Sequence, residues 1–309
     1  MALTRAALRS GPAPSDAMGN DMPRLPDVRR AARDVRSHVL RMGREERGRR
    51  ALWPDGAPGA VGSEACDHPT YSVYVPRDVK PTGDIIVVLP GGGYAGHAEH
   101  EASPVGRRLA AAGVCAVVVR YRLAPRYRHP AMLDDARQAI AVARARAPEW
   151  GLVRNRVGVL GFSAGGHLAG MAALFEGHES GGGHGRPDFA VLIYPVVQMT
   201  GECALAGVRG ALLGNLDETP LSADMSLDRC VGDGAPPCFI VHGNDDAVVD
   251  VRHSLRLAGA YRSAGRPFEL HVFAHGPHGF GLGRRGSPVG LWPDLCLAWL
   301  RAVPDSPRA

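Results

Sequence analysis

The chain has 309 residues, of which 45% are hydrophobic and 22% are charged, and this globular composition excludes a wholly disordered protein. No apolar run approaches the length of a membrane-spanning helix, and the first residues lack the apolar core of a secretory signal. We therefore expect a cytoplasmic protein without a membrane partner.

The positive charge is concentrated at the start of the chain. The net charge is +5, and residues 1–50 alone hold twelve Arg against six acidic residues. This pattern predicts a basic N-terminal arm over residues 1–50, partly helical or disordered, before a body over residues 51–309. Because acids alternate with the arginines and no aromatic residue accompanies them, a solvated surface is favoured over an arm that binds nucleic acid.

Beyond a Pro- and Gly-rich linker at residues 53–62, short apolar runs alternate with helical patterns. Strands are predicted at 71–75, 85–89, 115–121, 156–162, 189–194, 238–243 and 268–273, and helices at 103–113, 132–147, 164–175, 251–265 and 293–302. Near-continuous apolar strands separated by helices predict an α/β fold, with a parallel sheet covered on both faces.

One segment breaks this alternation. Residues 196–236 are polar, rich in Gly and Pro, and only weakly periodic. A long insertion of this kind in a compact domain is typical of a lid or of a loop that faces the substrate. We expect a lid-like insertion here.

The sharpest motif lies between a predicted strand and a predicted helix. Gly161, Ser163 and Gly165 form a G-x-S-x-G pattern, and a tight strand-to-helix turn at this place exposes the serine hydroxyl as a nucleophile. The alternative is that Ser163 only caps the helix. The position of the motif between strand and helix favours the nucleophile.

A serine nucleophile requires a base, and the base requires an acid that orients it. Asp245 and Asp246 follow the predicted strand 238–243, and His278 lies in a loop after the strand 268–273. The order Ser, Asp, His is that of the α/β-hydrolases. Each of these residues alone is weak evidence, but the serine, the acids and the histidine all lie just after predicted strands.

Glycines follow the strand at 85–89. In the sequence Pro90–Tyr94, three consecutive glycines allow backbone N–H groups to face a bound carbonyl. Gly91, Gly93 and Gly96 also fit a dinucleotide-binding pattern. That alternative requires a helix directly after the glycines and an acid at the end of the next strand. Here that strand ends in Arg120 instead, so the dinucleotide-binding alternative is disfavoured.

The six cysteines and thirteen histidines show no spacing typical of a metal site. Without a C-x-x-C pair or a secretory signal, reduced thiols are favoured over disulfides. We expect neither a metal nor a cofactor.

Several motifs together resemble a known superfamily. PGGGY at 90–94, GFSAGGHLA at 161–169, HGNDDAVV at 242–249 and GPHGF at 276–280 are similar to motifs of the α/β-hydrolases. The similarity spans residues 51–300. Within this superfamily, the motifs most resemble those of the bacterial acetylesterase and xylan-esterase-like serine esterases. These lie near the hormone-sensitive-lipase and dienelactone-hydrolase-like branches.

The resemblance implies an eight-stranded, mostly parallel sheet and ester hydrolysis through an acyl-enzyme. It implies that Ser163 is the nucleophile, Asp246 the orienting acid and His278 the base. The amides of the oxyanion hole would be those of Gly92, Gly93 and Ala164. The pattern H-G-x-x-D-x-x-V favours Asp246 over Asp245, and His167, one helical turn beyond Ser163, is expected to pack rather than to catalyse.

The expected function is hydrolysis of a small-molecule, short-chain ester of the acetyl type. A serine peptidase-like hydrolase and a hydrolase-fold module that binds a ligand without turnover are the alternatives. A binding module would be favoured by loss of a catalytic residue, and here each expected residue type is present.

Overall fold

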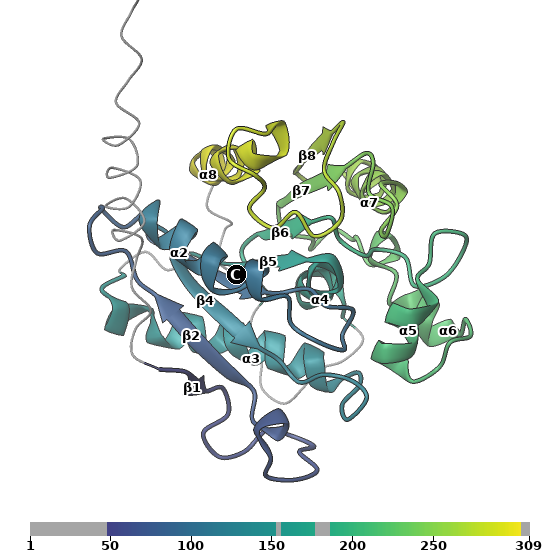
Figure 1. The fold of residues 1–309 in the computed structure, drawn as a ribbon, viewed down its shortest axis with the longest axis horizontal. Coiled ribbons are helices and arrows are strands. Elements are labelled where there is room, and N and C mark those ends of the chain that lie inside the picture. Colours follow the sequence, from purple (N-terminus) through teal and green to yellow (C-terminus); the bar gives the residue numbers. More distant parts are fainter. Residues whose placement is uncertain (1–47, 153–155, 177–185, 304–309) are drawn as a thin grey trace, which may run out of the picture. The chain divides into compact units, whose positions relative to one another are not determined.

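A computed structural model describes residues 48–152, 156–176 and 186–303 of the chain. Residues 1–47, which make up most of the predicted basic arm, lie outside the described residues. The described body is built around one eight-stranded sheet (Figure 1).

The strands of this sheet are arranged in the order β1-β2-β4-β3-β5-β6-β7-β8. β2 runs antiparallel to β1 and to β4, and the neighbouring strands from β4 through β8 pair in parallel. The bounds are β1 Arg50–Ala51, β2 Thr70–Tyr74, β3 Asp84–Leu89, β4 Cys115–Arg120, β5 Arg156–Phe162, β6 Ala190–Ile193, β7 Cys238–Gly243 and β8 Phe268–Phe273.

From β3 to β8, each connection between consecutive parallel strands contains at least one α-helix. The α-helices are α2 Ser103–Ala111, α3 Ala131–Arg146, α4 Ser163–Leu174, α5 Ala206–Leu213, α6 Pro220–Asp224, α7 Arg252–Ser263 and α8 Trp292–Ala302. Short 3-10 helices are η1 Ala65–Asp67, η2 Glu99–Glu101, η3 Ala147–Trp150, η4 Leu227–Arg229 and η5 Pro288–Leu291.

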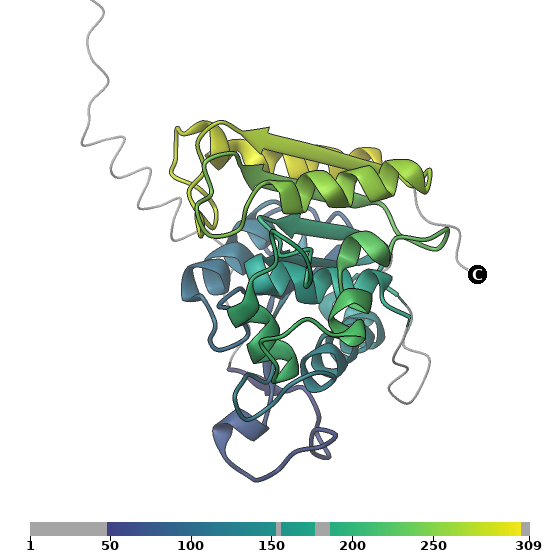
Figure 2. The ribbon, with the colours of Figure 1, turned by 90° about the vertical axis from the view of Figure 1, so that its right-hand side faces the viewer.

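Helices cover both faces of the sheet (Figure 2). α3, α4 and α7 pack on one face, and α2 and α8 pack on the other. Along β3, Val87 faces the first group and its neighbours Ile86 and Val88 face the second, and all three are fully buried. Successive side chains of a strand point to opposite faces, so a sheet covered twice requires the consecutive apolar residues seen in the sequence.

The predicted α/β fold with a mostly parallel eight-stranded sheet is confirmed. Seven strands lie where the apolar runs predict them. The eighth, β1, has only two residues and pairs with β2 through Arg50 and Tyr71. The sheet thus includes the last residue of the segment predicted as the arm.

The insertion at residues 196–236 contains more regular structure than its sequence suggests. α5, α6 and η4 all lie within it. It is attached to α7 by the buried imidazole of His253, whose Nδ1 accepts hydrogen bonds from the N–H groups of Val197 and Gln198, both at 3.0 Å. Nε2 of the same ring donates to the carbonyl of Cys203 at 2.8 Å.

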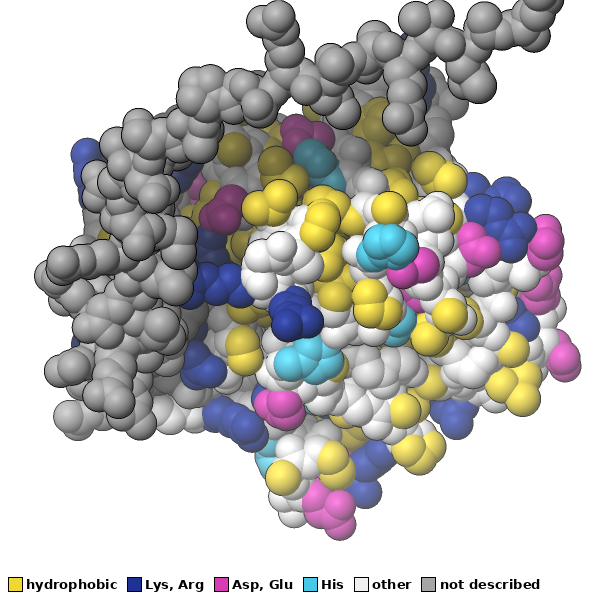
Figure 3. All heavy atoms as spheres, turned by 45° about the horizontal axis from the view of Figure 1, so that its top comes forward, with side chains coloured by type: hydrophobic (Ala, Val, Ile, Leu, Met, Phe, Trp, Pro, Cys, Tyr) yellow, Lys and Arg dark blue, Asp and Glu magenta, His cyan; other side chains and the backbone are white. Residues whose placement is uncertain are grey.

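Figure 3 shows basic and acidic side chains interspersed with hydrophobic side chains on one face of the molecule. The described part of this face therefore carries both signs of charge. This mixture agrees with a sequence whose excess of arginines lies in residues 1–50. Among the described residues, no helix combines the length and the apolar character needed to cross a bilayer.

Candidate active site

The candidate site lies at the edge of the sheet where the parallel strands end. The loops after β3, β5, β7 and β8 carry the glycines, Ser163, Asp246 and His278, respectively. Because parallel strands place their carboxyl ends at one edge, residues far apart in the sequence are brought together here.

Ser163 occupies a tight turn between β5 and α4. Its φ of 52° is a left-handed conformation that is uncommon for a residue with a side chain. The turn packs too closely for side chains at the flanking glycines. A Cβ atom on Gly161 would lie 2.0 Å from the carbonyl oxygen of Gly165, and one on Gly165 would lie 2.2 Å from that of Leu89. The G-x-S-x-G pattern is therefore a steric requirement of this turn.

His278 connects Ser163 with a carboxylate. Its Nε2 lies 2.9 Å from Oγ of Ser163, and its Nδ1 lies 2.8 Å from Oδ2 of Asp246. Since an ionised carboxylate only accepts, Nδ1 carries a proton, and Nε2 of the neutral ring accepts the hydrogen bond from the serine hydroxyl. This arrangement prepares Nε2 to take the serine proton.

The Asp246 side chain is buried and fully used as an acceptor. Its Oδ1 accepts hydrogen bonds from the N–H groups of Val248 and Val249, each at 2.9 Å. Burial alone would raise the pKa of Asp246, but the hydrogen bonds from His242, His278 and these two amides hold it below its ordinary value. Asp246 therefore stays ionised at neutral pH.

Asp245 has a different set of partners. Its Oδ1 accepts from the N–H of Gly276 at 2.7 Å, and its Oδ2 lies 3.3 Å from Nδ1 of His275. Asp246 thus contacts the imidazole of His278, whereas Asp245 holds the backbone of the loop that leads to it.

His242, at the end of β7, supports Asp246, a role that the sequence motifs do not predict. Its Nε2 donates to the carbonyl of Val249 at 2.8 Å and lies 3.5 Å from Oδ2 of Asp246. Its Nδ1 lies 2.7 Å from Oγ of Ser254 in α7. The signal for this residue was its place at the head of the H-G-x-x-D-x-x-V pattern.

The glycine loop after β3 offers free N–H groups. Gly92 and Gly93 have φ values of 128° and 64°, which glycine adopts without steric cost. Within the described residues, neither of their N–H groups donates a hydrogen bond to the protein. The N–H of Ala164 lies in the first turn of α4, where helical amides have no acceptor one turn earlier.

His167 joins this loop to the insertion. Its Nδ1 accepts a hydrogen bond from the hydroxyl of Tyr94 at 2.7 Å, and its Nε2 donates to the carbonyl of Met225 at 2.8 Å. Burial lowers the pKa of His167 to about 4, so the ring is neutral at pH 7. These contacts give His167 the packing position expected from its spacing after Ser163.

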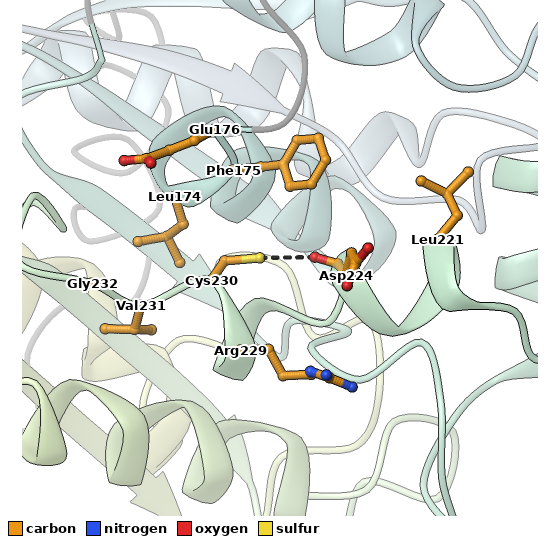
Figure 4. A pocket seen from close by; sticks show the side chains of 9 residues that line it. All are labelled: Leu174, Phe175, Glu176, Leu221, Asp224, Arg229, Cys230, Val231 and Gly232. Carbon is orange, nitrogen blue, oxygen red and sulfur yellow. Dashed lines mark hydrogen bonds between the residues drawn. The ribbon is translucent and has the colours of Figure 1, made fainter.

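A separate cavity of ≈ 510 Å³ lies at the other end of α4 (Figure 4). It is lined by residues such as Leu174, Leu221 and Cys230, and the length of α4 separates it from Ser163 by roughly 16 Å. Burial raises the pKa of Cys230 to about 12, and its thiol donates to the carbonyl of Asp224 at 3.1 Å. This thiol is therefore protonated and is not an activated nucleophile.

Within the described residues, no three His, Cys, Asp or Glu side chains gather in a way that could hold a metal ion. None of the six cysteines, which all lie within the described residues, forms a disulfide. At the sheet edge, the structure brings together the hydroxyl of Ser163, the imidazole of His278 and the carboxylate of Asp246.

Comparisons with known proteins cover most of the described body. Residues 71–261 match the BD-FAE family, and residues 221–302 match the prolyl oligopeptidase family. The acetylxylan esterase of Xylanibacter ruminicola is 33% identical over 230 residues, which are 73% of this chain and 47% of that protein. Endo-1,4-beta-xylanase B of Butyrivibrio fibrisolvens is 33% identical over 213 residues, which are 65% of this chain and 33% of that protein. The chain spans less than half the length of both proteins.

A solved structure is similar over nearly its whole length. The acetyl ester-xyloside bifunctional hydrolase from Caldicellulosiruptor lactoaceticus matches with a TM-score of 0.72 and 37% identity, over 82% of this chain and 96% of that chain. The BD-FAE match includes the Ser163 turn and Asp246. The chain belongs to the BD-FAE family, within the α/β-hydrolases.

Proposed function

We propose that this protein is a serine hydrolase that cleaves short-chain carboxylic esters, of the acetyl type, through an acyl-enzyme. The observation that carries the proposal is the continuous contact from Oγ of Ser163 through His278 to Asp246, with distances of 2.9 and 2.8 Å. Ser163 is the nucleophile, His278 the general base and Asp246 the acid that orients it.

In the first step, Oγ of Ser163 attacks the carbonyl carbon of the ester and Nε2 of His278 takes the hydroxyl proton. Asp246 stabilises the imidazolium that forms. The negative charge on the carbonyl oxygen is received by the N–H groups of Gly92, Gly93 and Ala164, which we assign to the oxyanion hole.

The tetrahedral intermediate then breaks its bond to the alcohol. His278 returns its proton to the leaving oxygen, and the acyl group stays on Ser163. Water, deprotonated by His278, then attacks the acyl carbon and the bond to Oγ breaks. His278 returns the proton to Ser163, and the carboxylic acid leaves. Each proton passes between Ser163, His278, water and the alcohol, so the proposed reaction requires neither metal nor cofactor.

The relatives support one substrate class. An acetylxylan esterase, a xylanase and an acetyl ester-xyloside hydrolase are all similar to this chain, and they support a small acetylated sugar as the ester. The peptidase alternative has less support, because the prolyl oligopeptidase match covers residues 221–302 and leaves out Ser163. We propose the cytoplasm as the location, since cysteines without disulfide bonds are usual there.

Turnover of p-nitrophenyl esters from acetate to octanoate tests this function. We expect the highest kcat/KM with acetate or propionate, and release of acetate from acetylated xylo-oligosaccharides. Ser163→Ala should lower kcat by about 10⁴-fold or more while the fold remains intact. Fluorophosphonate labelling should modify Ser163, and chelation with EDTA should leave the activity unchanged. Labelling of another residue, or highest activity with octanoate, would contradict the proposal.

A further inference from the structure

The backbone is strained at three strand ends around the site. Within the described residues, the non-glycine residues with positive φ are Tyr94, Ser163 and Tyr194, which follow β3, β5 and β6. Such a conformation is uncommon for a residue with a side chain and persists only where the surroundings hold it. Ser163 is the proposed nucleophile, and Tyr94 is held by His167. Tyr194, with a φ of 37°, has no role in the mechanism given above.

The side chain of Tyr194 lies against the loop that carries the catalytic imidazole. Its ring is 5.0 Å from that of His278 and 4.5 Å from that of Phe280, measured between centroids. Its hydroxyl accepts a hydrogen bond from the N–H of Gly281 at 3.0 Å. Tyr194 therefore contacts this loop both through its ring and through its hydroxyl.

The same hydroxyl donates to a buried carboxylate. It lies 2.6 Å from Oε1 of Glu101, a residue that is only 2% exposed. Burial and the neighbouring Glu101 raise the pKa of Tyr194 well above its ordinary value, so the phenol keeps the proton that it donates.

Glu101 also holds the glycine loop. Its Oε2 accepts a hydrogen bond from the N–H of Gly91 at 2.7 Å. A Cβ atom on Gly91 would lie 2.8 Å from this oxygen and 3.1 Å from Cβ of Ser163. One glycine backbone therefore separates the carboxylate from the side chain of the nucleophile.

We propose that Glu101 and Tyr194 form a positioning pair that holds the glycine loop at Gly91 and the His278 loop at Gly281 in a fixed relation to each other. This inference rests on the proposed function, because its consequence is the placement of the oxyanion-hole amides relative to the general base. The pair does not touch the substrate and acts through the two loops.

The pair requires a carboxylate at position 101. Glu101 receives two hydrogen bonds, one on each oxygen: one from the N–H of Gly91, which can only donate, and one from the hydroxyl of Tyr194, whose oxygen also accepts from Gly281. A glutamine has one acceptor oxygen and one NH₂ group, so it can keep the contact with Gly91 only by turning its NH₂ group towards Tyr194, whose hydroxyl must then give up its donation. Glu101→Gln thus breaks one connection and preserves the size of the side chain.

The test is steady-state kinetics of Glu101→Gln, Tyr194→Phe and the double variant with p-nitrophenyl acetate. Because a displacement near 1 Å costs about 10²-fold, we expect kcat of each single variant to fall by about 10- to 100-fold, with KM changed by less than about threefold. The rate of fluorophosphonate labelling should fall in parallel. Since both residues act as one unit, the double variant should be no more than about threefold slower than the slower single variant.

Asp67→Asn is the matched control. Asp67 is a buried carboxylate that accepts from a tyrosine hydroxyl, that of Tyr127, and from a backbone N–H, that of Glu64, as Glu101 does. Its partners lie outside the glycine loop and the His278 loop. This variant should lower the melting temperature and leave kcat within about twofold of the wild type.

Each outcome separates the inference from the proposed function. Wild-type turnover and its loss in Ser163→Ala test the function alone. The inference is overturned if folded Tyr194→Phe or Glu101→Gln keeps kcat within about threefold of the wild type, if KM rises while kcat is retained, or if the two losses multiply in the double variant. Tyr194→Phe retains the ring and its packing, so it decides the question even where Glu101→Gln folds poorly.

Discussion

The carboxylate of Asp246 lies 2.8 Å from Nδ1 of His278, on the side of the imidazole that faces away from Ser163. This relationship fixes the tautomer of the ring, because the proton on Nδ1 leaves Nε2 free to accept. Oδ1 of the neighbouring Asp245 instead accepts a hydrogen bond from the N–H of Gly276, at 2.7 Å. The two acids therefore offer a pair of variants that differ by one position.

We expect Asp246→Asn to lower kcat by about 10⁴-fold, because an amide at this place permits the wrong tautomer of His278, as in the serine proteases. Asp245→Asn should lower kcat far less, since it changes only the support of the loop backbone. Kinetics with p-nitrophenyl acetate measure both variants. A larger loss in Asp245→Asn would show that the assignment of the acid is wrong.

The packing of the Ser163 turn leads to a second prediction. In Gly165→Ala the new methyl group would meet the carbonyl oxygens of Leu89 and Pro90 at 2.2 and 2.4 Å, so the turn must shift. We expect a lower melting temperature and a fall in kcat of about 10²-fold, the usual effect of a displacement near 1 Å.

Gly207→Ala serves as its control, because a Cβ atom at this position in α5 meets nothing within 4 Å. Replacing this helical glycine should stabilise the fold by at most about 1 kcal/mol and leave kcat unchanged. Thermal unfolding and kinetics compare the pair. Equal effects of the two substitutions would contradict the steric argument.

Acid should destabilise the protein partly through Asp67. The hydrogen bond from Arg126 is the largest of several contacts that lower the pKa of Asp67 from 3.8 to about 2. A carboxyl whose pKa is lower in the folded state stabilises the fold above its unfolded pKa, and this stabilisation is lost as the pH falls towards the folded pKa. The window therefore runs from 3.8 down to about 2.

Melting temperatures of the wild type and Asp67→Asn, measured from pH 7 to pH 2, test this effect. The gap between the two proteins should be constant above pH 5 and should narrow towards pH 2. Because all other carboxyls are common to both proteins, the narrowing isolates Asp67. A gap that widens at low pH would refute the assignment.

A buried ion pair provides the fourth prediction. Arg122 and Asp135 lie 2.9 Å apart with side chains that are 0% exposed, and Asp135 also accepts from Nε1 of Trp53. Arg122→Met leaves the buried Asp135 without its opposite charge, so it should destabilise the fold by about 3–5 kcal/mol. The double variant Arg122→Met/Asp135→Leu should recover part of this loss of stability. A double variant less stable than Arg122→Met would contradict this prediction. Urea unfolding gives both values.

The sequence was sufficient for the elements that bury apolar side chains. Strands such as β3 and β5 lie where consecutive apolar residues predict them, because a sheet covered on both faces has a simple pattern. β1 was missed since two residues, Arg50 and Ala51, have no period, and their pairing with β2 is a tertiary event. α5 and α6 were missed for a similar reason, because they are short and the insertion is held by contacts such as those of His253.

The candidate site also contains residues that the sequence predicts and residues that it does not. The motifs identify Ser163, His278 and the two acids, because glycines and strand ends accompany them. Glu101, Tyr194 and His242 were not identified, because a buried polar side chain acquires its partners only when distant segments meet. No local pattern marks Glu101 as the acceptor for both Gly91 and Tyr194.

The position of His167 restricts how this protein can be engineered. An exchange of residues 196–236 for the insertion of a relative removes the carbonyl of Met225, the acceptor for Nε2 of His167. A neutral imidazole has a single N–H, so without that acceptor the tautomer that receives the Tyr94 hydroxyl loses its advantage. A chimera that keeps a backbone carbonyl at this point should retain the wild-type rate on a minimal ester. A chimera that lacks this carbonyl should be slower on every substrate. If only one substrate were measured, this general loss of rate would be mistaken for a change of specificity.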